Sequence, residues 1–161
     1  MLMESVHDIL ERYGGKIVED LRRSMADKKL NASGDTSRSI EYKVTDGKII
    51  MSLEILAHLA LIVLERGRGP NRGGSGGGLR AGIEKWVDSK PIRPFDPKMT
   101  KDQLVFLIVR KIAREGIKVP NRYNPGNVIS DVITDDLIRK INREVIQSNI
   151  DHMIQTVKQV I

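Results

Sequence analysis

Cysteine is absent from this chain of 161 residues, which excludes disulfide bonds and thiolate metal sites. Aromatic residues are scarce as well, because one Trp, three Tyr and two Phe make up only 4% of the sequence. Hydrophobic residues account for 40%, so the core is expected to be small and mainly aliphatic. The length of the chain is typical of a single domain, residues 1–161. Because partner subunits often complete a small core, we also expect the protein to oligomerise.

Long apolar runs and a strong charge imbalance are also lacking. The run Leu59–Leu64 is far shorter than the roughly 20 apolar residues that span a bilayer. Residues 1–15 lack the basic and apolar regions of a signal peptide. We therefore expect a soluble protein without membrane contact, made in a cytoplasm. The 27 Lys and Arg against 21 Asp and Glu give a net charge of +6, which is compatible with nearby nucleic acid but does not require it.

Residues suited to catalysis or metal binding are few and scattered. None of the three histidines, His7, His58 and His152, has a second histidine or a carboxylate at ligand spacing on one helix face. No Ser/His/Asp set can be identified, and a cysteine nucleophile is impossible. Asp135-Asp136 has the position of helix-terminus charge. We predict that the protein is not an enzyme and uses no cofactor or metal.

Glycine, in contrast, is concentrated in one segment, Glu65–Val87 (ERGRGPNRGGSGGGLRAGIEKWV), which holds eight of the 14 glycines. The segment lacks the Gly-Lys-Ser/Thr of a P-loop. A dinucleotide-binding pattern starting at Gly67 would need glycine where Arg72 stands. The composition is instead typical of a flexible linker, and we predict a flexible loop over residues 67–78.

Four arginines accompany these glycines: Arg66, Arg68, Arg72 and Arg80. They could contact DNA phosphates or acidic groups on a protein partner. No aromatic residue is interleaved for base stacking, so sequence-specific or single-strand recognition is not expected. We therefore favour a solvated or partner-facing loop.

Apolar periodicity predicts most of the secondary structure. Steps of three and four predict a helix over residues 3–29 that includes Gly14 and Gly15 and could bend there. A loop is expected at 31–37. The segment AHLALIVLERG predicts a short helix ending at Gly67, or a buried strand. Further helices are expected around residues 79–90, from a capping box at Thr100–Gln103 to Gly116, and over 135–160 with Thr134 as cap.

Two alternating segments around Asp46-Gly47 predict an antiparallel hairpin. A two-residue turn pairs Val44 with Ile49, Tyr42 with Met51, and Ile40 with Leu53. All six side chains then share one apolar face, which must pack on helices. The order of helix, hairpin and further helices, with a long C-terminal helix, predicts an α+β fold. Trp86, spaced with Leu79 and Ile83, is expected as a buried core anchor.

Several segments together resemble the tail-component proteins of tailed bacteriophages, which include minor tail, tail-completion and head–tail joining proteins. These segments are GDTSRSIEYKV, LERGRGP, IEKWVDSK and LVFLIVRKIAREGIKVP, followed by a proline-containing turn and a long amphipathic helix. The resemblance covers about residues 30–150. The Gly-rich insert at 73–78 departs from it.

The resemblance implies a structural virion protein of the neck or tail, synthesised in the host bacterial cytoplasm. Such subunits form rings that connect the portal complex to the tail and let DNA pass. We accordingly expect a homo-oligomeric ring, a hexamer or dodecamer, that contacts other neck, portal or tail proteins and touches genomic DNA non-specifically. The hairpin, with Ile40, Tyr42, Asp46 and Gly47, is expected at the subunit interface through strand addition. The alternative is a basic DNA-binding module.

Overall fold

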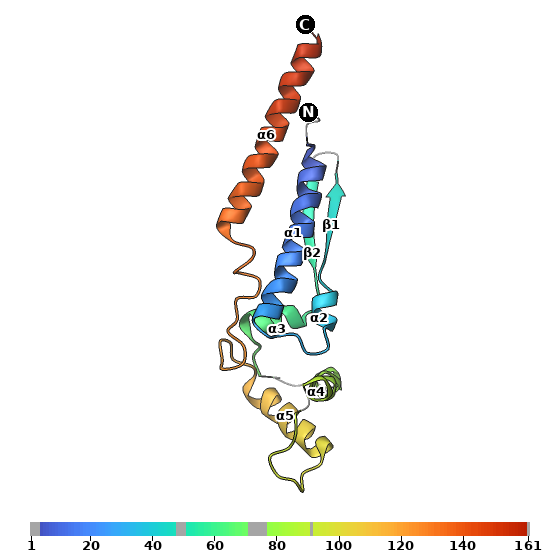
Figure 1. Ribbon diagram of the computed structural model, residues 1–161, viewed down its shortest axis with the longest axis vertical. Coiled ribbons are helices and arrows are strands. Elements are labelled where there is room, and N and C mark those ends of the chain that lie inside the picture. The colour runs from blue at the N-terminus through green and yellow to red at the C-terminus, as the bar shows by residue number, and fades with distance from the viewer. Residues whose placement is uncertain (1–3, 48–50, 71–76, 91, 161) are drawn as a thin grey trace.

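A computed structural model describes residues 4–47, 51–70, 77–90 and 92–160 of the chain. The molecule is elongated and has the predicted α+β architecture, with a long C-terminal helix running beside the N-terminal helix (Figure 1). The elements are α1 (Val6–Asp27), α2 (Asp35–Arg38), β1 (Glu41–Asp46), β2 (Met51–Leu56), α3 (Ala60–Arg66), α4 (Gly77–Ser89), α5 (Lys101–Glu115) and α6 (Asp135–Val160). None of the helices in these ranges is long and apolar enough to cross a membrane.

Helix α1 begins at a capping box and continues through its glycine pair. The Ser5 hydroxyl accepts the Asp8 N–H at 3.2 Å, and the Asp8 carboxylate accepts the Ser5 N–H at 3.1 Å. Gly14 is buried where the Tyr42 ring crosses the helix, and a Cβ built there would lie 2.4 Å from Cδ2 of that ring. The glycine therefore provides room for the sheet to approach α1 closely.

The hairpin forms, but its predicted register is wrong. Val44 pairs with Leu53, Tyr42 with Ile55 and Asp46 with Met51, so the connection spans residues 47–50 and is longer than the expected two-residue turn. Ile49 lies outside the described residues. The register shift is an even number of residues, so Tyr42, Val44, Leu53 and Ile55 still share one partly buried face, as the alternation indicated. Met51 is instead 42% exposed at the turn end of the hairpin.

The core lies between α1, the sheet, α3 and the segment before α6. Its buried members are aliphatic, as expected from the composition: Ile17, Val18, Leu21, Met25, Ile40, Leu61 and Val128. Leu137 and Ile141 of α6 pack against it from the side. Thr134 caps α6 by accepting the Leu137 N–H at 3.2 Å, which confirms the predicted start of that helix.

Helices α4 and α5 pack against each other below the α1–sheet unit (Figure 1). Val87 and Val105 are the buried residues of this pair. The prediction that Trp86 is a buried core anchor is wrong, because its side chain is 39% exposed. The neighbouring Val87 takes the inward position on the helix, which turns Trp86 toward the surface.

Two predicted loops contain regular structure. The segment 31–37 includes the start of α2, and Gly77 and Gly78 belong to α4. Gly67–Pro70 precede the undescribed part of the Gly-rich segment, and Arg68 in this stretch pairs with Ile117. The flexible loop predicted over 67–78 is therefore too long at both ends, and residues 71–76 lie outside the described residues. A single domain over residues 1–161 stays a prediction.

Candidate interaction groove

Helices α3 and α5 end in the same way. Gly67 follows α3 with φ +79°, and Gly116 follows α5 with φ +76°. Each glycine N–H bonds back into its own helix, to the Val63 carbonyl at 2.9 Å and to the Ile112 carbonyl at 2.8 Å. Positive φ favours glycine, so both helices terminate at the positions that the sequence predicted.

The two chain segments then meet in a short antiparallel bridge. The Arg68 N–H donates to the Ile117 carbonyl at 2.9 Å, and the Ile117 N–H donates to the Arg68 carbonyl at 2.8 Å. A Cβ at Gly67 would lie 2.1 Å from the Ile117 carbonyl oxygen, and one at Gly116 would lie 2.3 Å from that of Arg68. We call residues 67–69 and 116–118 the helix-end crossing; it joins the α4–α5 pair to the core.

Side chains around the loop before α6 fasten the end of α3. The buried Asn124 amide donates to the Leu64 carbonyl at 2.9 Å, and its own oxygen accepts the Gly126 N–H at 2.9 Å. The Glu65 carboxylate accepts the Ile129 N–H at 2.7 Å. These bonds satisfy buried polar groups and hold α3 in a defined position beside the crossing.

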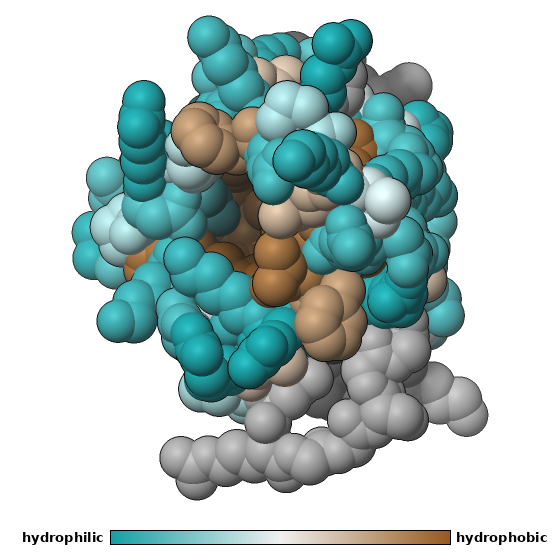
Figure 2. All heavy atoms as spheres, turned by 90° about the horizontal axis from the view of Figure 1, so that it is seen from below, coloured by the Kyte–Doolittle hydropathy of each residue, from teal (hydrophilic) through white to brown (hydrophobic). Residues whose placement is uncertain are grey.

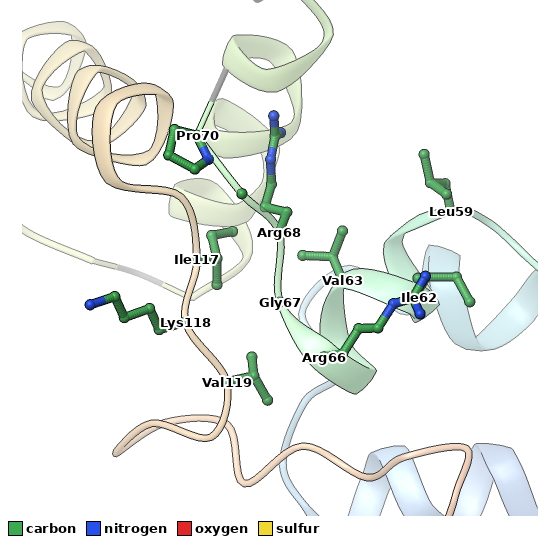
Figure 3. Close-up of a pocket in the computed structure, with 11 residues that line it drawn as sticks. Leu59, Ile62, Val63, Arg66, Gly67, Arg68, Pro70, Ile117, Lys118 and Val119 are labelled. Carbon is green, nitrogen blue, oxygen red and sulfur yellow. The ribbon is translucent and has the colours of Figure 1, made fainter. Parts of the chain in front are cut away.

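A groove of about 950 Å³ lies along α3 and the crossing. Figure 3 shows side chains of α3 and its N-cap on one side and Ile117, Lys118 and Val119 on the other. Leu59 is 79% exposed at one end of the groove. Arg66 and Lys118 contribute positive charge, and no carboxylate stands among the described residues that line it. We call this site the apolar groove; it has an apolar surface with a basic border.

The four arginines proposed as a patch do not gather in one place. Arg66 and Arg68 both line the apolar groove. Arg80 lies on α4, where its guanidinium contacts Glu84 at 2.8 Å and Asp102 of α5 at 2.5 Å. It therefore fastens α4 to α5. Arg72 lies outside the described residues.

The four hairpin residues proposed for the interface divide into two kinds. Ile40 is fully buried in the core, and Tyr42 packs on α1, where its hydroxyl donates to Glu11 at 2.7 Å. Their side chains pack within their own subunit, as expected for the apolar face of the hairpin, and the interface role proposed for the strand backbone stays a prediction. Asp46 and Gly47 are exposed at the turn end of the hairpin. Asp46 contacts His7 at 3.0 Å, and this hydrogen bond raises the pKa of the imidazole.

An ion pair connects the α4–α5 pair to α2. The Lys85 ammonium contacts the Asp35 carboxylate, which Arg38 also contacts at 2.5 Å. The hydrogen bond from Lys85 is the main cause that lowers the pKa of Asp35 to about 2. Beside it, Trp86 and Met25 line a hollow of about 390 Å³ between α4 and the core unit.

Helix α6 is fastened to α1 by a charged cluster. The Arg12 guanidinium donates to Glu4 at 2.8 Å and to Glu144 at 2.7 Å, and the Tyr13 hydroxyl donates to Glu144 at 2.7 Å. The hydrogen bond from Arg12 is the main cause that lowers the pKa of Glu144, and the one from Tyr13 adds to it. Burial raises the pKa of the Tyr13 phenol.

Apolar side chains are also exposed at the lower end of the molecule, which is formed by α5 and the segment before it (Figure 1). Phe106 and Leu107 of α5 lie beside a hollow of about 410 Å³, and Phe95 is fully exposed. Figure 2 views the molecule from this end and shows apolar surface at the base of a hollow surrounded by hydrophilic residues. No group of three or more described His, Cys, Asp or Glu residues is placed to hold a metal ion.

The groove residues after α5 were missed by reading the sequence. The helix was expected to end at Gly116, and Ile117, Lys118 and Val119 after it were assigned no role. The signal that could have found them is the similarity of ERGRGP and REGIKVP, since each places a charged residue, a glycine and then a proline after a helix. Comparison of the chain with family models, curated proteins and solved structures finds no match.

Proposed function

We propose that this chain is a structural protein of the neck or tail of a tailed bacteriophage and acts by assembly into a ring. The observation that carries the proposal is the exposed apolar surface at separate places on one elongated subunit, namely the apolar groove and the distal part of α6. Monomeric proteins rarely expose several such surfaces. A subunit with two different contact surfaces can form a cyclic oligomer.

The hairpin adds a third contact surface. Its sheet has only two strands among the described residues, and both outer edges are open there. A strand from a neighbouring subunit could pair with either edge through backbone hydrogen bonds. The exposed position of Asp46 and Gly47 is consistent with contact at this end.

A basic DNA-binding module is the second candidate, supported by the positive border of the apolar groove. Against it, Arg80 is engaged with two carboxylates, and the groove surface between its cations is apolar. Brief, non-specific contact with DNA in the lumen of a ring needs no more than the net charge of +6.

Two measurements on the purified chain separate the candidates. Electron microscopy should show rings with a central opening wide enough for duplex DNA, and single subunits at all concentrations would contradict the proposal. DNA binding is measured across a salt series for the chain and for a variant with Arg66 and Arg68 changed to alanine. The ring proposal expects negligible affinity at physiological salt. The DNA-binding module predicts tight binding that is lost in the variant. It also predicts that the logarithm of the affinity falls with the logarithm of the salt concentration, with a slope of about −0.9 per neutralised phosphate.

A further inference from the structure

The distal part of α6 carries an apolar stripe that its own subunit does not cover. Its members are exposed and follow one another at steps of one, three and four residues: Ile146, Ile150, Met153, Ile154 and Val157. At about 3.6 residues per turn these five side chains fall within about a third of the helix circumference. We call them the α6 stripe.

The α6 stripe faces away from the rest of the subunit. Leu137, Ile141 and Glu144, which contact the core and α1, lie on about the opposite side of the helix. The Ser148 hydroxyl donates to the Glu4 carbonyl at 2.9 Å, near the start of α1. Beyond this point α6 extends past the N-terminal end of α1 (Figure 1). The stripe is therefore presented on a projecting helix.

Such a projecting segment gains stability when it is covered. An isolated helix of about three turns is marginal in water, so its stability comes from packing an apolar face. Between Asn149 and Val160 the formal charges are one Asp and one Lys, which cancel. The segment therefore has no net positive charge to attract a nucleic acid. Covering its apolar side chains with another apolar surface is favourable, because both surfaces are removed from water.

The apolar groove matches the stripe in size and character. One helical turn, taken as a cylinder about 10 Å wide and about 5.4 Å high, occupies about 420 Å³, so the volume of the groove corresponds to about two turns. The segment from Ile150 to Val157 is two turns long.

We propose that the α6 stripe of one copy of this chain occupies the apolar groove of the next copy, as a helix docked in a groove. This inference rests on the proposed ring, because a ring of more than two subunits requires two different surfaces that fit each other. A stripe of five side chains is smaller than a standard interface, so the hairpin edge supplies further contact area.

Cross-linking between substituted copies tests this directly, because the natural chain has no cysteine. Met153→Cys is made in one preparation and Leu59→Cys in another, and the two are mixed and treated with a short bismaleimide. Tyr123→Cys is the matched control, since Tyr123 is 79% exposed like Leu59 and lies outside the groove. Cross-linked pairs should form between Met153→Cys and Leu59→Cys, and not with Tyr123→Cys.

Three other results would overturn the inference. Cross-linking of Met153→Cys with itself alone would show that α6 helices pair with one another. Cross-linking to Phe106→Cys would place the stripe at the lower end instead. Equal cross-linking to Leu59→Cys and Tyr123→Cys would show random collision.

Charge variants separate failure of this interface from failure of the ring. Met153→Glu and Leu59→Glu should each reduce the ring to smaller species, while Gln155→Glu, on the other side of α6, and Tyr123→Glu should leave it intact. Rings that persist in Met153→Glu and Leu59→Glu would refute the docking and leave the proposed function standing. An unsubstituted chain that is monomeric would refute both.

Discussion

The glycine pair in α1 allows a matched test of how the sheet meets the helix. Gly14→Ala and Gly15→Ala make the same chemical change at adjacent positions of one continuous helix. Each alanine should gain about 1 kcal/mol of helix propensity. The Cβ of Ala at position 14 would lie 2.4 Å from the Tyr42 ring, whereas at position 15 the nearest ring atom is 3.9 Å away.

The two variants should therefore change stability in different directions. Gly15→Ala should raise the free energy of unfolding by about 1 kcal/mol, because its Cβ makes an ordinary contact. Gly14→Ala adds an overpacking cost of about 1–3 kcal/mol to the same gain, so its net effect is about 0–2 kcal/mol of destabilisation. The ring cannot withdraw freely, because the Tyr42 hydroxyl is hydrogen-bonded to Glu11.

Urea unfolding of both variants measures the difference, which should be about 1–3 kcal/mol, and thermal unfolding should separate their Tm values by about 2–12 °C. A Tyr42→Ala background supplies the control. Without the ring, Gly14→Ala should become as stabilising as Gly15→Ala, which a double-mutant cycle detects. Equal stabilisation by the two alanines in the natural background would refute the close packing of Tyr42 on Gly14.

Three further predictions concern the crossing and the contacts between elements. Gly67→Ala should destabilise the protein by about 2 kcal/mol or more in urea unfolding, because the new Cβ meets a backbone carbonyl across the crossing at positive φ. The Asp35 pKa measured by NMR should be about 2 and should rise in Lys85→Gln; the stabilisation from this pair is complete above the ordinary carboxyl pKa and is lost as pH falls through about 2. Tyr13→Phe should cost about 1–2 kcal/mol and increase hydrogen exchange in α6, since it removes the 2.7 Å hydrogen bond to Glu144; unchanged exchange would contradict the role of this bond in holding α6.

Local signals in the sequence predicted the helices and the fold class well. The capping box at Thr100 and Gln103, the glycines after α3 and α5, and the Thr134 cap are short-range chemistry, and each is present in the structure. Alternation also predicted which face of the hairpin is buried. The register was wrong because Asp46-Gly47 suggested a two-residue turn, whereas the strands pair across residues 47–50. Tyr42 packs on Gly14 of α1, which is distant in the sequence. A local turn pattern carries no information about such a contact between distant segments.

The candidate site depended on contacts between distant segments and was only partly predictable. Arg66 and Arg68 were identified from their neighbourhood of glycines, but the groove they border is completed by Ile117–Val119, about 50 residues later. Arg80 had the same sequence context and is instead bound to Glu84 and Asp102. Composition indicated a small aliphatic core, yet it could not decide whether Trp86 or Val87 faces inward, because the two residues are adjacent on α4 and point about 100° apart around the helix.

Native mass spectrometry of the unsubstituted chain shows whether it assembles into a closed ring. The ring should have a mass six or twelve times the 18.1 kDa of one chain, without a series of larger species. The stoichiometry should stay constant as the protein concentration rises, because a closed ring leaves no unoccupied contact surface. A mass of 18.1 kDa at every concentration would contradict assembly, and a continuous series of masses would contradict ring closure.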